Sequence, residues 1–74
     1  MYEVICADGR PVYVTMQPDA YFEEYGYYYE VFADMNGDVI LDWGNTYDPN
    51  ESYEFALDYV CGIVEQGVYH FAFV

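Results

Sequence analysis

Acidic side chains are the most abundant chemically active groups in this sequence. Fourteen Asp and Glu residues stand against a single basic residue, Arg10, which gives a formal net charge of -13. Carboxylates can transfer protons, bind metal ions or present negative charge to a basic partner. With so many acids, pairs of carboxylates arise by chance. The overall charge is therefore a more informative signal than any one pair.

The sequence carries no catalytic or metal-binding motif. His70 is the only histidine and lies in an apolar, strand-like segment, where we expect a structural role. We find no Gly-rich phosphate loop, no Ser/His/Asp order and no Cys/His metal spacing. The stretch Asp34-x-Asn36-Gly37-Asp38 resembles part of a calcium loop, but its glycine comes one place too early and no closing glutamate follows. We therefore predict a protein that is not an enzyme and that holds no metal or cofactor.

The cysteines and the hydropathy indicate a cellular location. Cys6 and Cys61 are too few for the disulfide scaffold of a small secreted domain, so we expect free thiols in a reducing compartment. The chain begins with a strand-like segment and lacks the basic start of a signal peptide. No apolar run approaches the ~20 residues that a membrane span needs. We expect a cytoplasmic protein.

The elements that position the acids form one domain, residues 1–74. At 55% hydrophobic, the chain is too apolar to be disordered despite its charge. Alternation and turn residues predict strands at 2–7 and 10–16, a hairpin at 27–44, a helix at about 51–65 and a strand at 68–74. The segment 20–25 is compatible with one or two helical turns or with an extension of the next strand, and we predict an irregular or short helical connection. We predict an α+β fold, a small antiparallel sheet of about five strands (β-β-β-β-α-β) with one helix packed on one face.

The hairpin from Tyr27 to Gly44 is central to this prediction. Asp34 to Gly37 suits a type I turn with Gly37 in a left-handed conformation, and a two-residue Asn36-Gly37 turn is the alternative. A three-residue loop sets Val31 opposite Leu41 and Tyr29 opposite Trp43, which makes one side apolar. We therefore predict this register, with Leu41 and Trp43 buried. The other side then carries Tyr28, Glu30, Phe32, Asp34, Asp38, Ile40 and Asp42.

The predicted helix is also two-sided. Asn50 is a suitable N-cap, and Gly67 ends the helix. Apolar residues at helical spacing predict a core stripe made of Phe55, Ala56, Tyr59, Val60, Ile63 and Val64. Acidic residues form the opposite stripe, namely Glu51, Glu54, Asp58 and Glu65.

Rigid elements can display carboxylates at a phosphate-like spacing. Same-face residues on a strand lie about 6.5–7 Å apart and neighbours on a helix face about 5–6 Å, close to the ~7 Å between phosphates along one DNA strand. Asp19, Glu23 and Glu24 add further acids, and tyrosines make good interface anchors. An acidic coat for solubility is the alternative, but solubility needs a net charge of only about 2–8. The predicted partner-binding residues are Glu30, Asp34, Asp38, Asp42, Glu51, Glu54, Asp58, Tyr28, Phe32, Glu23 and Glu24.

In size, acidity, aromatic content and lack of a catalytic motif, the chain resembles the small phage-encoded inhibitors that mimic DNA. These include anti-CRISPR proteins and inhibitors of uracil-DNA glycosylase or restriction enzymes. The resemblance implies an inhibitor that acts in the host cytosol, as a monomer or small homo-oligomer, by occupying the basic nucleic-acid channel of its target. A CRISPR effector complex is the first candidate, because its channels are lined with Lys and Arg.

Partners of other kinds are disfavoured by the same charge. Direct nucleic-acid binding and anionic membranes both need basic residues, which are missing here. The competing hypothesis is a small acidic interaction module or accessory subunit that binds a basic protein without displacing nucleic acid.

Overall fold

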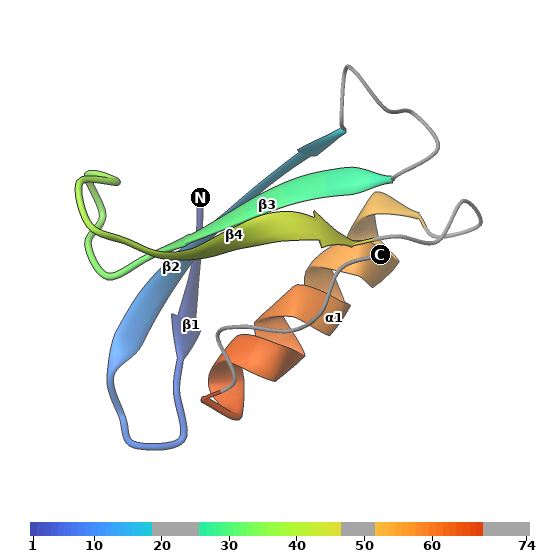
Figure 1. The fold of residues 1–74 in the computed structure, drawn as a ribbon. Helices are drawn as coiled ribbons and strands as arrows, with labels where there is room; N and C mark the ends of the chain where they lie inside the picture. Colours follow the sequence, from blue (N-terminus) through green and yellow to red (C-terminus); the bar gives the residue numbers. More distant parts are fainter. Residues whose placement is uncertain (19–25, 47–51, 68–74) are drawn as a thin grey trace.

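Four strands follow one another along the chain and form an antiparallel sheet, and a helix packs on one face of it (Figure 1). The structure is a computed structural model, and it describes residues 1–18, 26–46 and 52–67. The elements are β1 (Tyr2–Ile5), β2 (Pro11–Pro18), β3 (Tyr27–Phe32), β4 (Ile40–Thr46) and α1 (Tyr53–Glu65). Within these residues the strand order is β1-β2-β3-β4, so each strand pairs with its neighbours in sequence.

The predicted α+β architecture, an antiparallel sheet with one helix packed against it, is confirmed. The predicted fifth strand at 68–74 and the connection at 20–25 lie outside the described residues. The predicted end of the hairpin at Gly44 is too early, because β4 continues to Thr46, which pairs with Tyr27.

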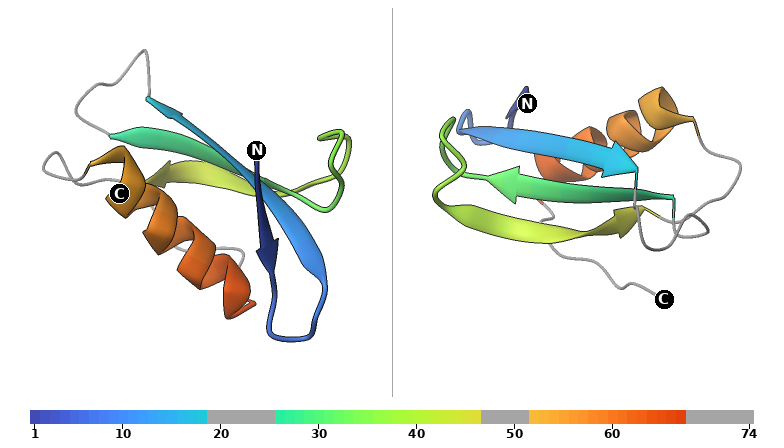
Figure 2. Two further views of the ribbon diagram at one scale, coloured as in Figure 1. Left: turned by 180° about the vertical axis from the view of Figure 1, so that it is seen from behind. Right: turned by 90° about the horizontal axis from the view of Figure 1, so that it is seen from above.

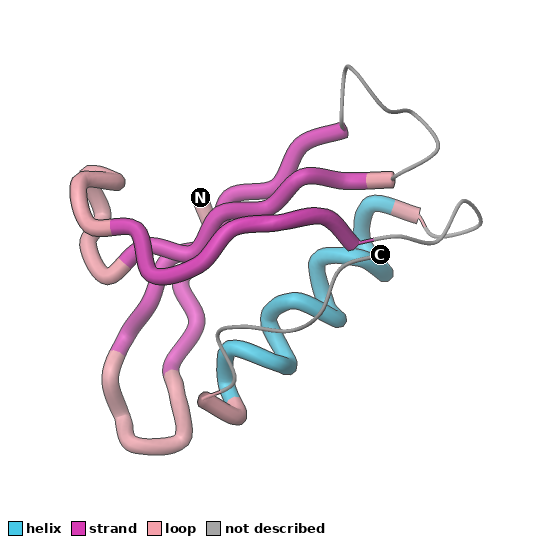
Figure 3. Tube along the Cα trace, viewed as in Figure 1, coloured by secondary structure: helices cyan, strands magenta, loops and turns pink. Residues whose placement is uncertain are grey.

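The turn of the central hairpin has the predicted conformation. The amide of Gly37 donates to the carbonyl oxygen of Asp34 (3.3 Å), and Gly37 has a left-handed φ of 76°. The Asp34 carboxylate accepts hydrogen bonds from the amides of Asp38 (3.1 Å) and Val39 (2.9 Å). Figure 3 shows residues 33–39 as a loop at the end of the sheet, away from the helix.

Beyond this turn, the predicted register is wrong. Phe32 pairs with Ile40, as the predicted loop requires, but the next residue, Val31, pairs with Asp42. Leu41 is therefore an extra residue in β4, a β-bulge, and every side chain after it faces the opposite way from the prediction. Trp43 is 57% exposed, whereas Asp42 is only 4% exposed. Leu41, also predicted to be buried, is exposed.

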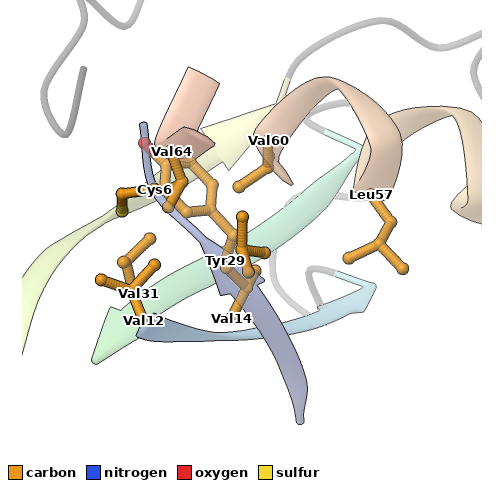
Figure 4. Packing of buried hydrophobic residues seen from close by; sticks show 9 residues of the cluster. Cys6, Val12, Val14, Tyr29, Val31, Leu57, Val60 and Val64 are labelled. Carbon is orange, nitrogen blue, oxygen red and sulfur yellow. The ribbon is translucent and has the colours of Figure 1, made fainter. Parts of the chain in front are cut away.

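The core lies between the sheet and the helix. Figure 4 shows its side chains pointing toward one another from the two layers. The strands contribute Val4, Val12, Val14, Tyr29 and Val31, Cys6 follows directly after β1, and the helix contributes Leu57, Val60 and Val64. Most of these are β-branched residues, which favour strands and pack well on a pleated surface. Cys6 is buried and Cys61 is half-buried, and the two do not form a disulfide with each other.

The helix begins later than predicted and buries a different stripe. Ser52 is the N-cap, and its hydroxyl accepts a hydrogen bond from the amide of Phe55 (3.3 Å). The predicted cap, Asn50, lies outside the described residues. Ala56, Leu57, Val60 and Val64 form the buried stripe. Two residues predicted for the core, Phe55 and Tyr59, are instead 65% and 52% exposed.

Candidate functional site

The helix covers only one side of the sheet, and Figure 2 shows the other side free of it. We call this other side the outer face. Because successive side chains of a strand alternate between faces, the register places rows of residues across it. One row is Glu3, Tyr13, Phe32 and Ile40, the next is Thr15, Glu30 and Trp43, and the third is Gln17, Tyr28 and Asn45.

Glu30 occupies the centre of the outer face. It lies directly opposite Thr15 on β2 and Trp43 on β4. Along its own strand, the neighbours on this face are Tyr28 and Phe32. Glu30 is half-buried in this mainly aromatic setting, while the Trp43 indole beside it is largely exposed.

The tyrosines of the outer face keep their protons at neutral pH. Burial raises the pKa of Tyr13, and a hydrogen bond to the Glu3 carboxylate and the charges of Glu3 and Asp34 raise it further. Burial and the charge of Glu30 raise the pKa of Tyr28. Both phenols are therefore hydrogen-bond donors at physiological pH.

The other predicted residues of the hairpin are not arranged as one acidic row. Asp38 is exposed in the loop, and Asp34 is engaged by the backbone amides of the turn, which lower the pKa of its carboxyl. Phe32 points to the outer face but is only 8% exposed. Its ring lies close to Gly37, since a Cβ built on that glycine would be 3.7 Å from the Phe32 Cε1 atom.

Asp42, predicted to face water, points into the helix side of the sheet. The hydroxyl of the buried Tyr29 donates a hydrogen bond to the Asp42 Oδ2 atom (3.3 Å). Burial raises the pKa of Tyr29 well above its ordinary value, and the neighbouring Asp42 charge adds to the effect. Asp42 is therefore part of the core and is removed from the candidate binding surface.

The helix carries the acidic stripe that the sequence predicted. Glu54, Asp58 and Glu65 are all exposed. Their spacing of four and seven residues places them on one side of the helix. The stripe also acts on Cys61, whose pKa is raised by burial and then by the charges of Asp58 and Glu65. A protonated, half-buried thiol is a poor nucleophile, which argues against cysteine chemistry at this position.

The predicted acids are thus divided between two sides of the molecule. Glu30 lies on the outer face of the sheet, whereas Glu54 and Asp58 lie on the exposed side of the helix, with the core between them. Glu23, Glu24 and Glu51 lie outside the described residues. Sequence reasoning missed Trp43, Phe55 and Tyr59 as surface aromatics, because periodicity alone assigned all three to the core.

Metal ligation finds no support in the described part of the chain, where no three His, Cys, Asp or Glu side chains gather in one place. None of its helices is long and apolar enough to cross a membrane. No protein-family model matches the sequence, and no curated protein or solved structure is significantly similar to it.

Proposed function

We propose that this protein is an acidic inhibitor that binds a basic nucleic-acid-handling target and blocks its nucleic-acid site by phosphate mimicry. A CRISPR effector complex is the first candidate target. The observation that carries the proposal is the exposed stripe of Glu54, Asp58 and Glu65 on a rigid helix, in a chain with a net charge of -13.

Within residues 1–18, 26–46 and 52–67, no basic side chain pairs with the acids of this stripe. The only basic side chain is Arg10, whose Nε lies 4.0 Å from the Asp8 carboxylate in an exposed pair. A field of this strength costs stability through self-repulsion, and a basic partner would relieve it. The same field would attract such a partner over long distances and speed its association.

The helix suits mimicry better than the hairpin does. On the hairpin, Asp42 is buried and Asp34 is engaged by the turn, so the predicted row of four acids is broken. On the helix, Glu54 and Asp58 lie about one turn apart, and Glu65 follows about two turns further along the same side. Phe55 and Tyr59 are exposed on the same element and could add apolar contacts beside the charges.

The test is displacement of labelled nucleic acid from purified targets, followed by fluorescence anisotropy. The targets are a guide-loaded CRISPR effector complex, a uracil-DNA glycosylase and a restriction enzyme. We expect the wild-type protein to displace the nucleic acid of one of them, with an association rate that falls steeply as salt is added. The triple variant Glu54→Gln, Asp58→Asn, Glu65→Gln should associate at least about tenfold more slowly.

A second triple variant controls for net charge. Glu3→Gln, Glu30→Gln, Asp38→Asn removes the same charge from the other side of the molecule. If the two triple variants are equally impaired, the helix stripe is not the mimic. A stable ternary complex of target, nucleic acid and this protein would instead support the accessory-module hypothesis, which the exposed Trp43 favours because such a residue serves docking rather than mimicry.

A further inference from the structure

We propose that the outer face of the sheet binds an arginine side chain of a protein partner, held between the Glu30 carboxylate and the Trp43 indole. This proposal goes beyond phosphate mimicry, because it concerns the opposite side of the molecule and does not require the partner to handle nucleic acid.

The first argument for this site is the geometry of the Glu30–Trp43 pair. Glu30 and Trp43 are directly opposite on adjacent antiparallel strands and share the outer face. Residues in this relation have Cβ atoms about 4.5–5.5 Å apart. A planar cation lying on the indole would therefore reach the neighbouring carboxylate. The β-bulge at Leu41 creates this pairing, since the unbulged register would have put Trp43 in the core.

The second argument is the surroundings of Glu30 and Trp43. Glu30 is half-buried, and its neighbours on the outer face are Thr15, Tyr28, Phe32 and Trp43, none of which is basic. A carboxylate in a partly apolar setting gains strongly from a cation with hydrogen-bond donors. Trp43 is 57% exposed, and tryptophan is the best aromatic acceptor for a cation over its face.

The chemistry selects arginine among cations. Its guanidinium is planar, stacks on aromatic rings and donates paired hydrogen bonds to a carboxylate, whereas a lysine ammonium is a strongly hydrated point charge. The net charge of -13 disfavours a second copy of this chain as the occupant, because the two copies would repel each other. The occupant is thus a basic protein segment that presents an arginine.

Trp43 is the only tryptophan of the chain, so biosynthetic labelling with 5-fluorotryptophan gives one ¹⁹F resonance at the proposed site. The probes are hexa-arginine, hexa-lysine and hexa-citrulline peptides, the first two of which carry equal charge. We expect hexa-arginine to shift the resonance at a concentration several-fold lower than hexa-lysine, and hexa-citrulline to have no effect. Glu30→Gln should weaken hexa-arginine binding about fivefold or more and remove the preference for arginine.

The matched control is Glu54→Gln, which removes the same charge from the helix. It should change the titration at Trp43 by less than about twofold. The thermal unfolding of each variant shows that the fold is retained. The proposal is wrong if hexa-lysine shifts the resonance at the same concentration as hexa-arginine, or if neither peptide shifts it. It is also wrong if Glu30→Gln and Glu54→Gln change the binding of hexa-arginine equally. None of these results depends on nucleic-acid displacement, so this failure is distinct from a failure of the proposed function.

Discussion

Asp42 was expected to face water, but it is buried in the core beside Tyr29. Burying a carboxylate is costly unless it receives hydrogen bonds, and the Tyr29 hydroxyl donates one. Tyr29→Phe keeps the ring but removes this donor. We expect it to lower the free energy of unfolding at neutral pH by about 1–3 kcal/mol.

The same residue gives a pH dependence. The pKa of Tyr29 is raised by folding from an ordinary value of 10.0, because burial and the charge of Asp42 disfavour the phenolate. Its contribution to stability is therefore complete below that value and is lost as the pH rises above it, where the unfolded chain releases the proton first. The free energy of unfolding, measured with urea between pH 8 and 12, should fall less steeply with rising pH for Tyr29→Phe than for the wild type. Parallel curves would contradict this assignment.

The pKa of Cys61 allows the charge of the acidic stripe to be tested in the isolated protein, with no binding partner added. Its pKa is raised by burial and by Asp58 and Glu65, so weakening the negative field should lower it. In a Cys6→Ala background, the rate of alkylation by iodoacetamide as a function of pH gives the apparent pKa. We expect Asp58→Asn with Glu65→Gln to shift this profile to lower pH. Glu30→Gln, on the other side of the molecule, should leave it in place, and an equal shift would show that only net charge matters.

At the scale of the elements, the sequence was sufficient for the four described strands, the turn and the helix but not for the register of the hairpin. Asp34 and Gly37 define the turn through local hydrogen bonds and a positive φ, which residue types reveal directly. The facing of Asp42 and Trp43 depends on a bulge at Leu41. The prediction assumed an unbroken ladder and an apolar inner side, whereas the Tyr29 hydroxyl makes a buried carboxylate tolerable.

The orientation of the helix was also beyond what the sequence pattern could predict. Phe55 and Tyr59 fit the helical period of the core, but the stripe that packs on the sheet includes Leu57 instead. Periodicity fixes which residues share a side of a helix, and only tertiary packing decides which side turns inward. The sequence therefore predicted that Glu54 and Asp58 face water, but it missed the exposure of Trp43.

The start of the helix allows a direct test of capping. Ser52→Ala removes the hydroxyl that accepts the amide of Phe55, and we expect a loss of about 1 kcal/mol in the free energy of unfolding. Ser52→Asp retains an acceptor and adds a charge that the helix N-terminus favours, so it should restore most of the loss. Chemical denaturation of both variants measures the difference. If Ser52→Ala is neutral, the cap lies elsewhere in the chain.

At the scale of the whole molecule, the net charge of -13 should limit stability. Salt shortens the Debye length from ~30 Å at 0.01 M to ~8 Å at 0.15 M, which weakens repulsion among exposed acids. We therefore expect the melting temperature to rise with NaCl over this range. The triple variant Glu54→Gln, Asp58→Asn, Glu65→Gln should respond less, because it has fewer charges to screen. A flat response of the wild type would mean that its acids are too far apart to strain the fold.

The bulge at Leu41 also determines where the chain can change length. The turn side of the hairpin and its far side follow two different registers, and Leu41 is the one residue that separates them. Deleting Leu41 would join the two registers into an unbroken ladder and leave Asp42 and Trp43 facing as they do now. Deleting a residue later in β4 would reverse the facing of all residues between that point and the bulge. The loss of one residue should therefore be tolerated at position 41 and should destabilise the hairpin a few residues further on.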